Sequence, residues 1–300
     1  MLPCVFLSLV APDCAAESIS VKIPQAAAHT FLLLRTQEGK AVAVGEMTQS
    51  VRAAKVTTRV KFRFDDGSKY EETTVFSQHG VFQVLSDHTL QTGPAFKDPM
   101  EVWIDCRSGQ VKVRDMKPGK DLGKDKKNKD RDRDKNKNRS KDDDKDNAND
   151  NASEKSAAGD GDKAEGNVIT FRVKIPPDLA NGILPVIVEN FPDEGQHTVT
   201  MLAATPKPRI VKLILSPQGE DTFSVGKTSY KAVHYVAKVE LGGIAGAVAP
   251  LVGKQPPDTG FWVFKGSAPV FLKSAGPLSA DSTVWQIELA SPTWSGSSEN

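Results

Sequence analysis

Apolar and polar residues alternate along much of this chain, and that pattern restricts it to a β-rich fold. In residues 56–64 the even positions are apolar, apart from Thr58, and the odd positions are Thr, Arg or Lys. A period of two predicts a strand with one buried face and one solvated face. The Asp65-Asp66-Gly67 run predicts a hairpin turn into residues 70–78, because these residue types tolerate positive φ angles.

The same pattern recurs on both sides of a highly charged segment. It predicts further strands at 81–87, 102–105, 110–114, 168–175, 197–204, 209–215, 230–241, 261–265, 270–273 and 284–289. Two helices are predicted at 177–191 and 243–252, although Gly182 and Pro185 weaken the first. The second is apolar but far shorter than the roughly 20 residues that a bilayer span requires.

We therefore expect a mainly β (α+β) fold. It consists of one curved antiparallel sheet or open β-barrel of roughly a dozen strands, with the two short helices covering its apolar face. Neither half of the chain contains an obvious complete sheet by itself, so residues 17–116 and 167–291 should form one domain, followed by a flexible tail at 292–300. Two separate domains are the alternative.

Residues 117–166 are expected to be a long disordered loop inserted in this domain. They contain 15 Lys or Arg and 14 Asp or Glu, and Leu122 is their one large aliphatic residue. Such a segment buries too little apolar surface to offset the entropy of ordering it. Its cancelling charges argue against specific nucleic-acid binding. Lys135 and Lys141 occupy the Gly and Glu positions of a calcium loop that would begin at Asp130. We favour a solvated spacer; weak contact with a polyanion and loose cation binding are the alternatives.

The first 16 residues are expected to be a cleaved secretory signal. An apolar stretch is followed by small residues that end at Ala16, although the segment lacks the basic residue that usually precedes the apolar stretch. We therefore expect an exported protein, periplasmic or extracellular; a strand of the fold is the alternative. Removal of the signal takes away Cys4 and Cys14 and leaves Cys106 alone, which excludes an internal disulfide and a cysteine-based zinc site.

Short motifs indicate no catalytic, metal or cofactor site. The five histidines lack metal-ligand spacing, and residues 219–228 have six residues between the two glycines where a phosphate-binding loop has four. The Gly-x-Ser-x-Gly turn of serine hydrolases does not occur. The acid pair Glu71/Glu72 is interpreted as solvated surface. Asp87 precedes His88 and is placed to orient its imidazole.

Three segments carry a resemblance at family level. They are PPDLANGILPVIVENF (176–191), GEDTFSVGKTSYKAVHYVAKVELGGIAG (219–246) and APLVGKQPPD (249–258). Together they resemble an uncharacterised group of bacterial exported β-rich proteins, whose fold is similar to that of the periplasmic lipoprotein carriers. The resemblance implies an open antiparallel barrel with a hydrophobic interior lidded by helices, and it carries over no functional residue. Fold likeness raises the prior for an apolar ligand without showing one.

The expected function is therefore non-enzymatic binding of an apolar ligand or lipid-like group in the cell envelope. Alternatives are an envelope interaction protein with a packed core and, less favoured, a hydrolase. The expected partners are an apolar ligand or an envelope protein, without a specific nucleic acid, a cofactor or a metal. The candidate lining positions, which core packing would explain equally well, are Val60, Phe62, Phe64, Phe171, Trp285 and Ile287.

Overall fold

The computed structural model describes residues 18–116, 168–192, 194–203, 205, 208–225, 228–240, 256–266, 268–278 and 283–290. All of these belong to one compact unit. Four predicted features lie outside the described residues: the signal, the charged insertion, the second helix and the tail.

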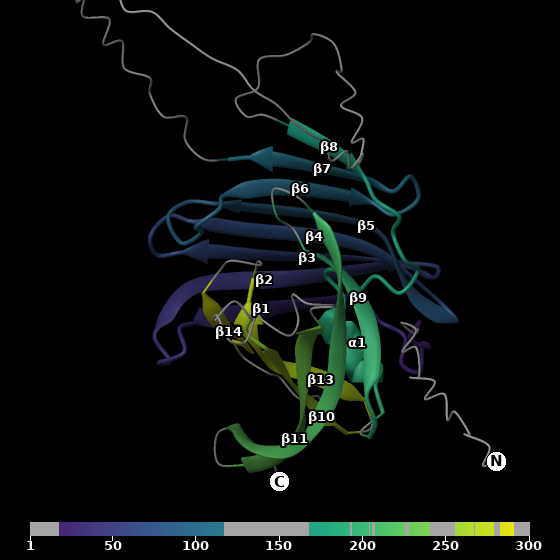
Figure 1. Ribbon diagram of the computed structural model, residues 1–300. Coiled ribbons are helices and arrows are strands. Elements are labelled where there is room, and N and C mark those ends of the chain that lie inside the picture. The colour runs from purple at the N-terminus through teal and green to yellow at the C-terminus, as the bar shows by residue number, and fades with distance from the viewer. Residues whose placement is uncertain are drawn as a thin grey trace, which may run out of the picture. The chain divides into compact units, whose positions relative to one another are not determined.

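Fourteen strands form one antiparallel sheet in the described part of the chain (Figure 1). The strands are β1 Ala28–Arg35, β2 Ala41–Arg52, β3 Lys55–Phe64, β4 Lys69–His79, β5 Val81–Thr92, β6 Met100–Asp105, β7 Gln110–Asp115, β8 Val168–Arg172, β9 His197–Ala203, β10 Arg209–Val225, β11 Thr228–Glu240, β12 Thr259–Lys265, β13 Pro269–Pro277 and β14 Val284–Leu289. Their order across the sheet is β8-β7-β6-β5-β4-β3-β2-β1-β14-β13-β12-β11-β10-β9.

Neighbouring strands in this sheet are consecutive in the chain, with one exception. The exception is the pair β1 and β14, which joins the two halves of the sheet in the middle. The edge strands β8 and β9 are not paired with each other, so the sheet is open. The prediction of a mainly β, antiparallel fold is confirmed, whereas the alternative of an open β-barrel is not.

The predicted hairpin after β3 is confirmed in detail. Gly67 has a φ of 84°, and its amide donates to the carbonyl of Phe64 at 3.1 Å. The Asp66 carboxylate accepts from the Ser68 amide at 2.9 Å, as in an Asx turn. A positive φ is available to glycine at no steric cost, so residue types alone were enough to predict this turn.

Two strands, β1 and β2, were not predicted. In β1 the run Phe31-Leu32-Leu33-Leu34 is apolar at every position. Leu32 and Leu34 are buried on one face of the strand, whereas Phe31 is 62% exposed on the other. Val44 in β2 is also 62% exposed. Apolar residues on both faces hide the period of two on which strand prediction depends.

A β-bulge at Leu85 changes which residues of β5 face inward. Before it Phe82 and Val84 are buried, and after it Asp87 and Gln91 are buried instead. One extra residue in a strand moves all later side chains to the opposite face. The buried residues after the bulge are polar, which explains why the prediction ended this strand at 87 rather than 92.

The one described helix, α1, spans Leu184–Asn190 and is shorter than the predicted 177–191. Residues 181–183 form a turn, in which Gly182 has a φ of 67° and lies against Thr74 of β4. Pro185 lies in the first turn of the helix, where backbone N–H groups have no partner within the helix and its missing N–H costs nothing. The Asn190 side chain accepts from the amides of Lys22 and Ile23 at 3.0 and 2.7 Å, which anchors the N-terminal segment.

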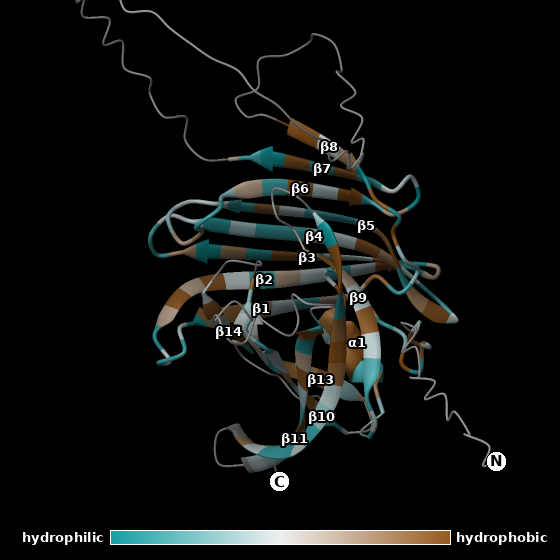
Figure 2. Cartoon of the chain, in the orientation of Figure 1, coloured by the Kyte–Doolittle hydropathy of each residue, from teal (hydrophilic) through white to brown (hydrophobic). Residues whose placement is uncertain are grey.

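Helix α1 packs into the larger of two hydrophobic clusters on one face of the sheet, which we call the inner face. This cluster joins α1 to β3–β7 of the first half and to β9–β12 of the second. A smaller cluster around Phe62 and Trp285 joins β1–β4, the β5–β6 loop and β14. Figure 2 shows α1 as predominantly hydrophobic and the first-half strands as alternating along their length. Helix α1 therefore covers apolar sheet surface as predicted.

The edge strand β9 is covered by the segment before α1. The backbone of Ala180 donates to the Thr200 carbonyl at 2.8 Å, and the Asn181 amide bonds both the N–H and the C=O of Leu202 at 2.8 and 3.0 Å. An unpaired strand edge is a site for unwanted association. Residues 178–181 therefore act as a short fifteenth edge element and protect this side of the sheet.

Candidate functional site

Five of the six predicted lining positions lie together on the inner face. Phe62, Phe64 and Trp285 are buried in the smaller cluster, and Val60 and Ile287 pack against it half-buried. The Phe64 and Trp285 rings meet edge to face, with centroids 5.7 Å apart. Phe171, on β8, packs instead against the cluster around α1. The five side chains therefore fill space against one another.

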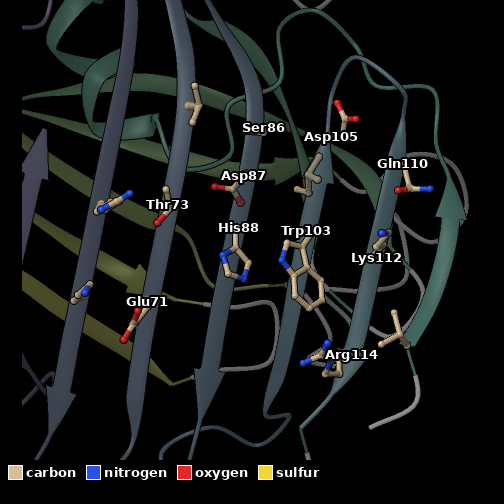
Figure 3. A pocket seen from close by; sticks show the side chains of 15 residues that line it. Glu71, Thr73, Ser86, Asp87, His88, Trp103, Asp105, Gln110, Lys112 and Arg114 are labelled. Carbon is tan, nitrogen blue, oxygen red and sulfur yellow. The ribbon is translucent and has the colours of Figure 1, made fainter. Parts of the chain in front are cut away.

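An open hollow of about 930 Å³ lies on the opposite, outer face of the first half (Figure 3). It runs across β3–β7 and reaches β8. Its lining is largely polar and was not predicted. The lining residues are Arg59, Lys61, Glu71, Thr73, Val75, Ser86, Asp87, His88, Trp103, Ile104, Asp105, Gln110, Lys112, Arg114 and Val168. We call this hollow the outer groove.

One register row forms the axis of the outer groove. The paired positions in that row, from β3 to β7, are Arg59, Thr73, His88, Trp103 and Lys112. Each of these residues lies on the side of its strand that faces away from the core. Their alignment depends on pairing register, which the sequence pattern of single strands does not determine.

Four side chains contact one another at the groove, of which His88, Trp103 and Arg114 line it and Glu101 lies beside them. The His88 and Trp103 rings are 6° from parallel with centroids 5.2 Å apart, and the Arg114 guanidinium lies 5.2 Å from the Trp103 ring centroid. Glu101 accepts from Arg114 at 3.1 Å and lies 2.9 Å from His88 Nε2. The stacking contacts and the charge-assisted hydrogen bonds together fix the positions of these side chains. We call these four residues the groove quartet.

Glu101, rather than Asp87, contacts the His88 imidazole. The prediction that Asp87 orients His88 is wrong in this respect, because successive side chains of a strand point to opposite faces. Asp87 points inward, where it accepts from Thr74 at 2.7 Å and from Thr89 at 3.3 Å. Its backbone still lies in the groove floor, as Figure 3 shows.

Two carboxyl groups lie beneath the groove, on the inner face of β4 and β5. Burial raises the pKa of Glu72 to about 8 and that of Asp87 to about 6, and the two charges repel one another. Hydrogen bonds from Thr74 and Thr89 partly offset this effect at Asp87. Burial beside these acids also raises the pKa of Tyr70 well above its usual value. The interpretation of Glu72 as solvated surface is therefore wrong, because the alternation of β4 turns it inward.

Two cations at opposite ends of the groove form no ion pair with any residue in the described ranges. They are Arg59 on β3 and Lys112 on β7, and both are exposed. Lys61, which also lines the groove, likewise forms no ion pair in the described ranges, but it lies directly opposite Glu71 and Glu46 in the register. The groove thus has an uncompensated positive charge at each end of its axis.

A second set of the same residue types lies on the outer face of the other half. His234 and Trp262 are 7° from parallel with centroids 4.2 Å apart, and Lys273 Nζ lies 4.2 Å from the Trp262 ring centroid. Trp262 Nε1 donates to Asp221 at 2.7 Å. Burial, followed by the nearby Lys273 charge, lowers the pKa of His234, and Asp221 opposes this shift. We call these four residues the second quartet.

Neither quartet is a metal centre by composition. Across the described ranges, no three His, Cys, Asp or Glu side chains gather closely enough to hold a metal ion. The described helix is also too short to cross a bilayer. No protein-family model matches the chain, and no curated protein or solved structure matches it either.

Proposed function

We propose that this protein is a non-enzymatic binding protein and that its outer groove holds a hydroxyl-rich glycan chain. The observation that carries the proposal is the groove quartet at the centre of the hollow. A rigid arrangement of ring edges and charged groups provides hydrogen-bond donors and acceptors at fixed positions before the ligand arrives, which reduces the ordering cost of binding. Thr73, Ser86 and Gln110 add hydroxyl and amide groups around it.

The character of the lining favours a glycan over other ligand classes. A drug-sized apolar ligand usually occupies a deep site with mostly hydrophobic walls, whereas this hollow is an open stretch of sheet with polar walls. Single-stranded nucleic acids are held by bases stacked on open aromatic faces. His88 and Arg114 come from the strands on either side of Trp103 and flank its indole, so its faces are already in use.

We also propose the exported location predicted from the N-terminal residues. Extended polysaccharides are abundant at cell surfaces, so a glycan ligand suits an exported protein. The proposal is closer to the interaction-protein alternative than to the apolar carrier, since the predicted lining positions pack against each other. The likeness to lipoprotein carriers stays a prediction.

Binding of the full-length protein to a panel of soluble polysaccharides tests this proposal. We expect affinity electrophoresis to show retardation by at least one polysaccharide, confirmed by titration calorimetry. Trp103→Ala should weaken that binding by at least about tenfold, the equivalent of a lost hot-spot contact. Trp262→Ala is the matched control and should bind normally.

Circular dichroism of both variants checks that the sheet is intact. If Trp103→Ala proves unstable, His88→Gln serves as a second groove variant. Normal binding by folded groove variants, or equal loss in Trp262→Ala, would contradict the assignment of the site.

Binding of an apolar ligand on the inner face is a second candidate. The observation that favours it is Trp285 Nε1, which is buried without a hydrogen-bond partner in the described part of the chain. A buried donor left unsatisfied costs free energy that a ligand acceptor would recover. Native mass spectrometry of the purified protein tests this candidate; a co-purifying lipid that Trp285→Phe loses would support it, and a clean apo mass would contradict it.

A further inference from the structure

The uncompensated charges of the outer groove specify its ligand more narrowly than the groove quartet does. Arg59 and Lys112 stand at the two ends of one register row, and no described carboxylate pairs with either. Three strands, β4–β6, separate the two. Neighbouring strands in a sheet are about 4.8 Å apart, so these two positions are separated by roughly 19 Å.

Carboxylates lie in the register rows on either side of this axis. Glu71 is in one of these rows and Asp105 is in the other, and Glu101 is already paired with Arg114. These carboxylates repel a ligand that carries an anion on every unit, whereas the cations at the two ends of the axis attract anions that are more widely spaced. The hydroxyl and amide groups of Thr73, Ser86 and Gln110 suit the neutral part of a sugar chain.

We infer that the ligand is an acidic glycan in which acidic and neutral sugars alternate, bound across the strands with carboxylates on Arg59 and Lys112. This inference rests on the proposed function and adds charge, spacing and direction to it. A sugar ring in an extended chain is about as long as the spacing between strands. Carboxylates two disaccharide repeats apart therefore match the separation of the two cations, and the carboxylate between them would lie over β5, at His88 in the middle of the row.

Hyaluronan oligosaccharides are suitable probes, because glucuronate alternates with a neutral sugar. The hexasaccharide presents carboxylates two repeats apart, and the tetrasaccharide does not. We expect titration calorimetry of the full-length protein to give about tenfold tighter binding of the hexasaccharide, as one added charge-assisted contact would provide. Chitohexaose, the neutral chain of equal length, should bind more weakly than the hyaluronan hexasaccharide.

Single substitutions assign the charges to their partners. Arg59→Gln and Lys112→Gln should each weaken hexasaccharide binding about tenfold, and together about a hundredfold, because the two sites are distant and independent. Each substitution should weaken binding of chitohexaose less than binding of the hexasaccharide, because chitohexaose carries no carboxylate. Arg63→Gln and Lys69→Gln, on the same face of β3 and β4 but outside the groove lining, are the matched controls.

Several results would overturn the inference while leaving the proposed function standing. Equal affinity for chitohexaose and the hyaluronan hexasaccharide is one, and normal binding by the Arg59 and Lys112 variants is another. Tighter binding of a heparin hexasaccharide or of single-stranded DNA at the same salt concentration would contradict the requirement for widely spaced anions. Failure to bind any glycan, neutral or acidic, would remove the proposed function as well.

Discussion

The groove quartet and the second quartet contain the same kinds of side chain, but their acidic and basic groups lie at different positions. In both, a His lies directly opposite a Trp in the register, His88 to Trp103 and His234 to Trp262. Two residues before each Trp, however, the first half has Glu101 and the second has Gly260. That difference decides which groups remain free for a ligand.

At Glu101 the carboxylate contacts both the His88 imidazole and the Arg114 guanidinium. It holds Arg114 beside Trp103, and Lys112, the direct partner of Trp103 in the register, is left unpaired. At Gly260 there is no side chain, and the Trp262 ring leans over the backbone toward Asp221. The direct partner of Trp262 is Lys273, which is used in stacking on it. Similar side chains thus leave the direct register partner of the Trp unpaired in one half and stacked on the Trp in the other.

The largest expected effect comes from inserting one residue after the bulge of each half. One alanine inserted after Ser86 would turn His88 to the inner face and Asp87 to the outer, at a cost of at least about 3 kcal/mol of stability. One alanine inserted after Gln218, the extra residue at the β10–β11 bulge, should cost only about 1 kcal/mol, since residues 219–222 are exposed. Urea unfolding followed by circular dichroism measures both, and equal costs would show that the β5 register is not special.

The next effect is the pH dependence of the first half. Because the folded pKa values of Glu72 and Asp87 are raised, the folded state holds protons that the unfolded state releases. This contribution is favourable below about pH 4 and is lost as the pH rises toward about 8. Wild-type stability should therefore fall by about 1–3 kcal/mol between about pH 5 and pH 8, the full shift being reduced by partial solvent exposure.

Glu72→Gln should remove most of that decline. The control is Glu71→Gln, a change of the neighbouring carboxylate on the outer face, which should leave the slope unchanged. Urea unfolding at several pH values measures the slopes. A wild-type protein that grows more stable over this range, with Glu72→Gln unchanged, would show that the inner carboxyls are ionised in the folded state.

A smaller effect is expected at the position that distinguishes the quartets. A methyl group on Gly260 would meet Trp262 Cη2 at 2.8 Å and His234 Nε2 at 3.1 Å, so Gly260→Ala should displace the indole and cost about 1–2 kcal/mol. Near-ultraviolet circular dichroism and chemical unfolding report the change. Glu101→Ala at the equivalent position creates no clash but breaks the bonds to Arg114 and His88, and it should weaken glycan binding instead.

The smallest effect concerns the protonation of His234. Its lowered pKa means that the unfolded state takes up a proton more readily, so the second half contributes stability that is lost as the pH falls below about 6.5. This sign is opposite to that of the first half. His234→Gln should reduce the loss on acidification, measured as the difference in thermal midpoint between neutral and mildly acidic buffer. A larger loss in the variant would show that the charged imidazole is stabilised by Asp221.

The sequence pattern predicted best those strands whose apolar residues are buried and whose polar residues are exposed. The limits of β14 were predicted without error, and β3, β6 and β7 were within two residues. The helix was predicted too long. The apolar residues Leu179 and Ile183 are buried, but Leu179 lies in an extended segment and Ile183 in a turn rather than in α1. Apolar periodicity reports burial, and several backbone conformations can bury the same side chains.

The candidate site was less predictable than the fold. Polar residues on the solvated side of a strand are ordinary, and nothing in the local sequence distinguishes Arg59 or Lys112 from other surface cations. Trp103, an aromatic residue on a solvated face, is the one local signal that could have drawn attention to this surface. To predict the site from Trp103, one must also know that His88 lies opposite it, and the position of His88 depends on the bulge at Leu85.

The sequence by itself determined the two-faced strands, the tight turns and the division of residues between core and solvent, because these follow from the period of two and from the φ preferences of residues such as Gly67. The tertiary structure decided which strands became neighbours, which register they adopted and which polar residues met across them. The pairing register determines which face of a strand is buried, and a single extra residue in the strand reverses the two faces beyond it. For that reason Asp87 lies buried while His88, the next residue, lies in the groove.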